Sequence, residues 1–228
     1  MVKVVIFGNE KMAELAYFYF THDSEFEPVA FTVDKEFIIK ESLFNLPVVP
    51  FEDVEKIYSP TDYKVFIAIG YSKLNSIRAK QYTKAKEKGY KFVSYICSKS
   101  IMWGDTQIGE NCFILENQVI QPNVRIGNNV FIWSGNHFGH DVIVEDHCYI
   151  ASHIVISGNV KIKKFSFIGI NAALRDNITI GEECIIGAGS LILHDINDKE
   201  VYISKMPDKY PLNSTQFERM MDISNKNS

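Results

Sequence analysis

A short stretch in the second half of the chain holds four of its six histidines. They are His137, His140, His147 and His153, within "HFGHDVIVEDHCYIASH". Histidine transfers protons near neutral pH and is also a common metal ligand. A metal site needs several such side chains to converge, whereas a general base needs one imidazole with a carboxylate beside it. His140 is followed directly by Asp141 and therefore suits the second kind of chemistry.

The sequence around these histidines repeats every six residues. Every sixth residue from Ile108 to Ile192 is large and apolar, and Ile96 and Met102 extend this register towards the N-terminus. This period is the hexapeptide signature of a parallel β-helix, in which three hexads make one turn of a triangular coil. The apolar side chain points into the prism, and glycine or asparagine permits the tight corners. The sequence therefore predicts stacked coils from about residue 98 to residue 211.

The position of each histidine within its hexad predicts the direction in which its side chain points. His147 and His153 hold the same position in consecutive hexads, so they lie on different faces and cannot share a ligand. No three histidines are expected to converge within one subunit, and we predict no metal. A zinc site completed by a neighbouring subunit stays an alternative. The pair His194-Asp195 repeats the His140-Asp141 dipeptide in the final coil, where we expect a solvated surface histidine.

The N-terminal part has a different pattern. Apolar runs at 2–8, 28–34, 63–70 and 90–96 predict buried strands, and helical spacing occurs at 10–20, 51–57 and 72–89. Alternating strands and helices predict a small parallel, Rossmann-like α/β domain. We expect this domain at 1–97, the β-helix domain at 98–211 and a polar, partly disordered tail at 212–228.

Composition limits the classes of function. The chain has 228 residues and a net charge of -4, which argues against a broad surface for nucleic acid or an anionic membrane. No segment has the length and hydropathy of a signal peptide or membrane span, so a cytoplasmic protein is expected. The four cysteines form no C-x-x-C pair, which predicts reduced, packed thiols.

Three motifs carry a resemblance to a known family. They are "SGNHFGHD" (134–141), "GNVKI…FIGINAALRDNITIG" (158–181) and "IIGAGSLILHDI" (185–196). With the α/β start, they resemble a bacterial family of acyl-CoA-dependent sugar acyltransferases with a left-handed β-helix. Many members N-acetylate a nucleotide-linked deoxy amino sugar, and others O-acetylate sialic acid or related sugars. The resemblance implies His140 as the general base, Asp141 as its partner, acetyl-CoA as co-substrate and a homotrimer.

The resemblance also suggests binding residues. The nucleotide-sugar would lie in the α/β domain, beyond the carboxyl ends of the strands, where open α/β sheets bind ligands. The residues expected to bind it are Gly8, Asn9, Glu10, Asp34, Gly70 and Trp133. For Trp133 burial at a subunit contact is an equal alternative to stacking on the sugar or nucleotide. Those expected along the donor groove are Tyr149, Gly158, Ile170 and Ala188. The first turn does not fit G-x-G-x-x-G, so dinucleotide binding is not expected. Arg78 is expected on a solvated helix face.

Three hypotheses about function stay open at this point. The first is N-acetylation of a dTDP-, UDP- or GDP-linked amino sugar for bacterial surface glycans such as lipopolysaccharide or O-antigen. The second is O-acetylation of a sugar hydroxyl with the same histidine as base. The third is a trimeric, non-catalytic scaffold that binds a nucleotide-sugar.

Overall fold

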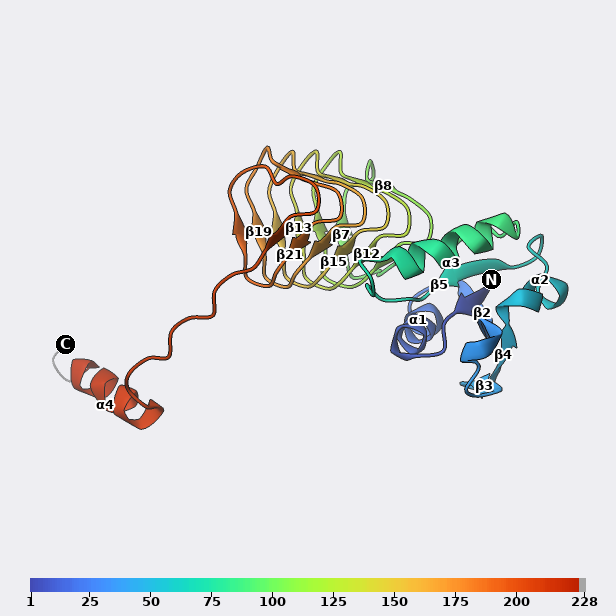
Figure 1. Cartoon of the computed structure of the whole chain (residues 1–228), viewed down its shortest axis with the longest axis horizontal. Coiled ribbons are helices and arrows are strands. Elements are labelled where there is room, and N and C mark those ends of the chain that lie inside the picture. Colours follow the sequence, from blue (N-terminus) through green and yellow to red (C-terminus); the bar gives the residue numbers. More distant parts are fainter. Residues whose placement is uncertain (226–228) are drawn as a thin grey trace.

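The computed structural model describes residues 1–225, with side chains as far as Met221. An α/β domain lies at one end of a stack of coils, and the C-terminal helix α4 lies beyond the opposite end (Figure 1). No helix within the described residues is long and apolar enough to cross a membrane.

The α/β domain is built on one five-stranded sheet. Its elements are β1 (Val2–Phe7), α1 (Lys11–His22), β2 (Phe26–Val33), η1 (Lys35–Phe37), β3 (Ser42–Leu43), β4 (Leu46–Pro50), η2 (Phe51–Asp53), α2 (Val54–Ile57), β5 (Lys64–Ile67) and α3 (Ser76–Glu87). The strand order is β3-β4-β2-β1-β5. All pairs are parallel except β3 with β4. The predicted parallel α/β arrangement is confirmed at this level.

The strand predicted at 90–96 is wrong as a fourth strand of this sheet. Phe92 makes a single bridge to Val65, and the chain then turns away. Its next strand, β6 (Tyr95–Ile96), pairs with β9 (Phe113–Ile114) and so opens a sheet of the coil. The amide of Tyr95 donates to the carbonyl of Cys112, which is in the following coil. The apolar run 90–96 does not show which of two parallel sheets it joins, because strands of both sheets are buried and apolar.

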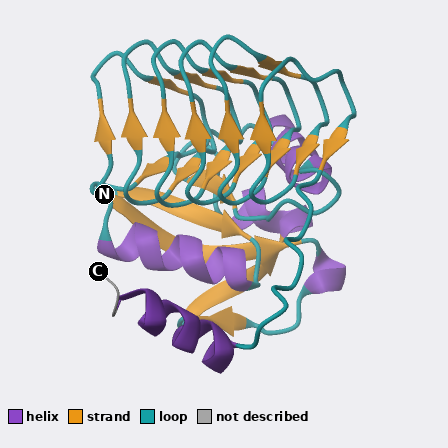
Figure 2. Cartoon of the chain, turned by 90° about the vertical axis from the view of Figure 1, so that its left-hand side faces the viewer, coloured by secondary structure: helices purple, strands orange, loops and turns teal. Residues whose placement is uncertain are grey.

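Residues 95–202 form a three-sided parallel β-helix, as the hexapeptide period predicts. We name each face by its strand in one coil. The β13 face contains β7 (Ile101–Met102), β10 (Val119–Ile120), β13 (His137–Phe138), β16 (Val155–Ile156), β19 (Ala173–Leu174) and β22 (Leu191–Ile192). The β14 face contains β8 (Gln107–Ile108), β11 (Arg125–Ile126), β14 (Ile143–Val144), β17 (Lys161–Ile162) and β20 (Thr179–Ile180). The β15 face contains β6, β9, β12 (Phe131–Ile132), β15 (Tyr149–Ile150), β18 (Phe167–Ile168), β21 (Ile185–Ile186) and β23 (Val201–Tyr202). Figure 2 shows the strands of successive coils standing side by side.

The inside of the prism is apolar and its corners are strained. The sixth-residue aliphatic side chains, such as Ile150 and Ile168, are fully buried in one core. The residue at the turn is left-handed in coil after coil, for example Asn129 at φ 56° and Asp141 at φ 59°. Asparagine and aspartate tolerate this conformation better than other residues with side chains. The buried, unpaired thiols predicted for the cysteines are confirmed, including Cys148 within this core.

The β15 face packs on the α/β domain through aromatic side chains. Phe66 of β5 stacks on Phe131 with ring centroids 5.8 Å apart, and Phe113 lies beside both. Arg78 of α3 is also in this interface, with none of its surface exposed. The expectation that Arg78 lies on a solvated helix face is therefore wrong. Helix α3 presents it to backbone carbonyls of the coil, which one sequence cannot reveal.

The C-terminal segment leaves the β-helix after β23 and ends in helix α4 (Ser214–Asn225), which the sequence did not predict. The side chains of Asn213 and Gln216 cap this helix by exchanging hydrogen bonds with each other's backbone amides. Residues 226–228 of the predicted tail lie outside the described residues.

Candidate active site

His140 and Asp141 stand together at the corner between β13 and β14. His140 Nδ1 lies 2.7 Å from Asp141 Oδ2, and both side chains are exposed. Asn123, one coil earlier, donates from Nδ2 to Asp141 Oδ1 at 3.1 Å. The hydrogen bond from His140, and then that from Asn123, hold the pKa of Asp141 below its usual value. Because an ionised carboxylate only accepts, Nδ1 carries a proton and Nε2 of the neutral ring keeps its lone pair.

The imidazole of His140 rests on the next coil. A Cβ added to Gly158 would lie 2.6 Å from His140 Nε2 and 2.8 Å from its Cε1. Only glycine therefore leaves room for the ring in this position. The amide of His140 is fixed from below, since it donates to the Gln121 side-chain oxygen at 2.9 Å. The His140 ring is thus oriented by the Asp141 carboxylate on one side and by the backbone of Gly158 on the other.

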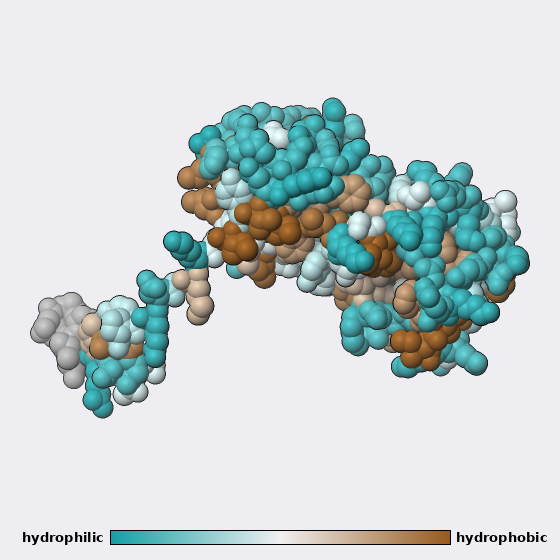
Figure 3. Space-filling view, viewed as in Figure 1, coloured by the Kyte–Doolittle hydropathy of each residue, from teal (hydrophilic) through white to brown (hydrophobic). Residues whose placement is uncertain are grey.

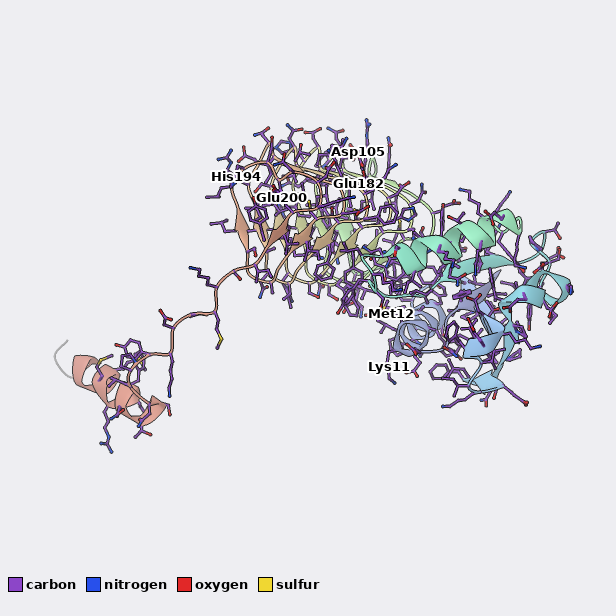
Figure 4. All side chains as sticks on the ribbon, in the orientation of Figure 1. Lys11, Met12, Asp105, Glu182, His194 and Glu200 are labelled. Atoms are coloured by element: carbon purple, nitrogen blue, oxygen red, sulfur yellow. The ribbon has the colours of Figure 1, made fainter. Side chains whose placement is uncertain are left out.

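A large cavity opens at the carboxyl ends of β1, β2 and β5. We call it the sheet-edge pocket; its volume is about 850 Å³. Its lining includes five of the residues predicted to bind the nucleotide-sugar, namely Gly8, Asn9, Glu10, Asp34 and Gly70. Lys11 and Met12, which also line it, lie at the start of α1 (Figure 4). Gln81 of α3 donates to Asp34 at 2.7 Å and so fixes the orientation of that carboxylate.

A smaller cavity follows the corner between the β15 and β13 faces. We call it the corner groove; its volume is about 270 Å³. It is lined by Tyr71, Trp133, Tyr149, Ala151, Ser152, Phe167, Gly169, Ile170 and Ala188. Three of the four positions expected along the donor groove lie here. Trp133, expected to contact the acceptor, lies in this groove with them and does not line the sheet-edge pocket.

One chain does not bring His140 and the corner groove together. His140 and Gly158 lie at the corner that follows the β13 face, whereas the corner groove lies at the corner that precedes it. The whole β13 face separates them. A reaction that uses both would need a second copy of the chain to place its histidine beside this groove.

The other histidines of the stretch do not converge on His140. His147 and His153 lie at the two other corners of the coil, and His137 lies on the β13 face. Among the described residues, no three His, Cys, Asp or Glu side chains could hold a metal ion together.

His147 is instead a packed histidine. Its ring lies 4.8 Å from that of Phe165, and its Nδ1 accepts from Asn129 Nδ2 at 2.9 Å. Burial lowers the pKa of His147 from 6.5 to about 4. The neutral ring is therefore the form that the folded chain holds at neutral pH.

This burial makes stability depend on pH. Between pH 6.5 and about 4 the unfolded chain binds a proton at His147 that the folded chain does not. The free energy of unfolding should therefore fall with falling pH in this range, by less than the limit of about 1.4 kcal/mol per pH unit because solvent screens the partly exposed ring. His147→Gln should flatten that part of a Tm-against-pH curve, whereas His194→Gln should not. Equal slopes in wild type and His147→Gln would contradict the assignment.

Several lining residues escaped the sequence analysis. Ile77 and Gln81 face the sheet-edge pocket from α3, and their spacing of one helical turn was the available signal. Ala151 and Ser152 line the corner groove because they follow β15 at the same corner as Trp133 follows β12. Counting hexads from Trp133 would have found them.

Comparison with protein families gives one match. The family described as "Bacterial transferase hexapeptide (six repeats)" matches residues 105–137, 123–158 and 159–194. These residues cover most of the coils and none of the α/β domain. No curated protein matches the sequence.

Solved structures share the fold over nearly the whole chain. A mutant of perosamine N-acetyltransferase from Caulobacter crescentus, in complex with CoA and GDP-perosamine, has a TM-score of 0.78 at 22% identity, covering 91% of this chain and 97% of that one. The acetyltransferase domain of PglB from Neisseria gonorrhoeae has a TM-score of 0.77 at 22% identity, covering 89% and 96%. WeeI from Acinetobacter baumannii has a TM-score of 0.73 at 20% identity, covering 90% and 97%. At these identities the similarity establishes the fold.

Proposed function

Because residues 105–194 carry the bacterial transferase hexapeptide repeat, we propose that this protein is an acetyl-CoA-dependent N-acetyltransferase. Its substrate is the amino group of a nucleotide-linked deoxy amino sugar. The observation that carries the proposal is the exposed His140–Asp141 pair, whose Nδ1···Oδ2 distance is 2.7 Å, on a fold that also provides two ligand-sized cavities. Asp141 fixes the tautomer that leaves Nε2 free to accept a proton.

The two cavities divide the substrates between them. The sheet-edge pocket, formed by residues 1–97 as a Rossmann-like acceptor domain, takes the nucleotide-sugar through Gly8, Asn9, Glu10, Asp34 and Gly70. The corner groove of the left-handed β-helix, which spans residues 95–202, takes the pantetheine of acetyl-CoA. The structural relatives support the choice of ligands, since one is a complex with CoA and GDP-perosamine and another is a complex with acetyl coenzyme A.

The reaction is a direct transfer without a covalent enzyme intermediate. The sugar amine attacks the thioester carbonyl, and His140 Nε2 accepts the proton that the amine loses. The tetrahedral intermediate collapses, the C–S bond breaks, and the His140 imidazolium returns its proton to the departing thiolate, so that CoA leaves as its thiol. Asp141 stabilises the imidazolium in between. The backbone N–H of Gly158, in the next coil and next to the ring, is the proposed donor to the oxyanion. Both substrates are held at once, so much of the rate comes from their orientation.

The site is completed by a homotrimer. The β13 face exposes Ile101, Val119, Val155 and Leu191, which are 67%, 41%, 48% and 65% exposed. Figure 3 shows hydrophobic surface running along the coils beside a hydrophilic region. An apolar stripe of this kind marks an interface. Three copies packed around a three-fold axis would place the His140 corner of one beside the corner groove of the next.

A charge on the β13 face should break this assembly. Val155→Lys would put an ammonium into the interface, where burying a valine otherwise contributes about 1.5–3 kcal/mol. We expect the trimer to dissociate in sedimentation equilibrium and transferase activity to disappear with it. Thr179→Lys, on the β14 face, is the matched control and should stay trimeric. A Val155→Lys protein that remains a trimer would refute this interface.

Two other functions fit parts of the same site. A sugar O-acetyltransferase would use the same base, and a non-catalytic scaffold would need only the pockets. One assay separates them: CoA release from acetyl-CoA with UDP-, dTDP- and GDP-linked amino sugars and their hydroxyl analogues. Turnover with amines alone supports the proposal, and turnover with hydroxyls alone supports O-acetylation. No turnover with any acceptor, despite binding, supports the scaffold. The N-acetylation proposed here would take place in the cytoplasm, where acetyl-CoA and nucleotide-sugars for surface glycans are made.

A further inference from the structure

We propose that Arg78 is a positioning residue that holds one loop, residues 69–72, as the shared wall of the sheet-edge pocket and the corner groove. The effect on catalysis that follows rests on the function proposed above. The loop comes directly after β5 and contributes to both cavities. Ile69, Gly70 and Ser72 line the sheet-edge pocket, whereas Tyr71 lines the corner groove.

All five N–H groups of the buried guanidinium are used. Nη1 donates to the carbonyls of Ile69 at 3.3 Å and Gly70 at 3.0 Å. Nε donates to Asn129 Oδ1 at 3.1 Å. Nη2 donates to the carbonyls of Asn129 at 3.1 Å and Cys148 at 3.2 Å. One side chain thus joins the loop of the α/β domain to two successive coils of the β-helix.

The surroundings of the guanidinium indicate that it holds backbone carbonyls and does not form an ion pair. None of its hydrogen bonds goes to a carboxylate, and its face lies 4.2 Å from the centre of the Phe131 ring. Burial lowers the pKa of Arg78 to about 9, so the group stays charged at neutral pH. Burying a charge is costly unless its hydrogen bonds are complete. A flat fork with five donors is the group that can hold four carbonyls and an amide oxygen at once.

The loop needs such an anchor because its continuation is strained. Lys73, Leu74 and Asn75 all have left-handed backbones, with φ of 50°, 48° and 64°. Three consecutive residues in this region persist only where the surroundings impose them. At the other end, the amide of Ile67 is held by Asn111 Oδ1 at 2.7 Å. Between these points the carbonyls of Ile69 and Gly70 are held by Arg78.

Tyr71 transmits the position of the loop to the groove. Its ring centroid lies 5.0 Å from that of Tyr149 and 5.0 Å from that of Phe167, both of which line the corner groove. A displacement of the loop would therefore move Gly70 at one ligand and Tyr71 at the other. Misplacing a positioned group by about 1 Å can cost on the order of 10²-fold in rate.

The test compares two substitutions of Arg78 with a control on the same helix. Arg78→Met removes every donor, and Arg78→Lys keeps the charge with three donors instead of five. Tyr82→Phe removes a hydrogen bond from α3 to Glu110 of the β-helix without touching the loop. Two measurements are made on each full-length protein: hydrogen–deuterium exchange of peptides spanning residues 68–75, and steady-state kinetics with both substrates varied.

We expect Arg78→Met to exchange faster in this loop and to raise KM for the nucleotide-sugar and for acetyl-CoA, with kcat/KM lower by about 10²-fold. Arg78→Lys should recover part of the effect, and Tyr82→Phe should show neither change. A simple loss of folded protein lowers kcat and leaves both KM values unchanged. That result, or unchanged exchange in the loop, would overturn the proposal.

The two proposals fail separately. Absence of turnover in the wild type would refute the proposed function. Calorimetric titration with CoA and with nucleoside diphosphates then tests Arg78 without catalysis: weaker binding of both ligands by Arg78→Met, but not by Tyr82→Phe, supports the positioning role, and unchanged binding refutes it.

Discussion

Replacing His140 with alanine should lower kcat by about 10²–10⁴-fold, the usual contribution of a general base. The side chain is 64% exposed and contributes nothing to the apolar core, so Tm should stay near that of the wild type. The measurement is CoA release at saturating concentrations of both substrates. His140→Asn should lose as much, because an amide can accept a hydrogen bond but cannot take a proton at neutral pH.

His194 provides a matched control for this experiment. It too is followed by an aspartate, Asp195, and it lies at the end of the β-helix farthest from the α/β domain (Figure 4). Asp195 accepts a hydrogen bond from the amide of Thr179, the first residue of β20. His194→Ala should retain the activity of the wild type. If both alanine variants turned over normally, His140 would not be the base.

Gly158→Ala should reduce activity almost as severely while leaving His140 in the chain. The new Cβ would lie 2.6 Å from Nε2 and would force the ring off the backbone on which it rests. A displaced base is expected to lower kcat by about 10²-fold. The fold should tolerate the change, because the exposed ring can turn into solvent. Unfolding and kinetics should be measured on the same preparation.

Two further variants make this prediction specific to His140. Gly104→Ala adds a methyl group where nothing lies within 4 Å, so it should leave kcat unchanged. In the His140→Ala background Gly158→Ala should have little further effect, since there is no ring left to displace. Two independent losses that multiply would show that the methyl group acts elsewhere.

The coil was predictable because its signal is local and repeated. Each hexad places one aliphatic residue, such as Ile132 or Ile150, inside the prism, and a single misassigned hexad would break the register. The position of Asp141 beside His140 follows from the same register. Residues at strand ends, such as Gly8 and Asp34, were also accessible, because parallel strands bring their carboxyl ends to one edge.

The contacts between the two parts of the chain were not predictable in this way. Arg78 stands in a mostly polar helix, and its partners Asn129 and Cys148 are 51 and 70 residues away along the chain. Trp133 was expected near the acceptor, but its neighbours depend on which face of the prism the α/β domain covers. The packing of the α/β domain on the β-helix depends on complementary shape and on complete hydrogen bonding. Neither of these produces a repeating pattern in the sequence.

The strict register of the β-helix makes it a molecular ruler. His137 pairs with Val155, which pairs with Ala173, so the coil repeats in identical steps of about 4.8 Å along its axis. Duplicating or deleting one whole coil after Gly158 would leave His140 and Gly158 in place. It would shift the far end of the corner groove by about 4.8 Å along the axis. Duplication of the gene segment for one coil could therefore adapt the groove to acyl donors of different length without changing His140 or its surroundings.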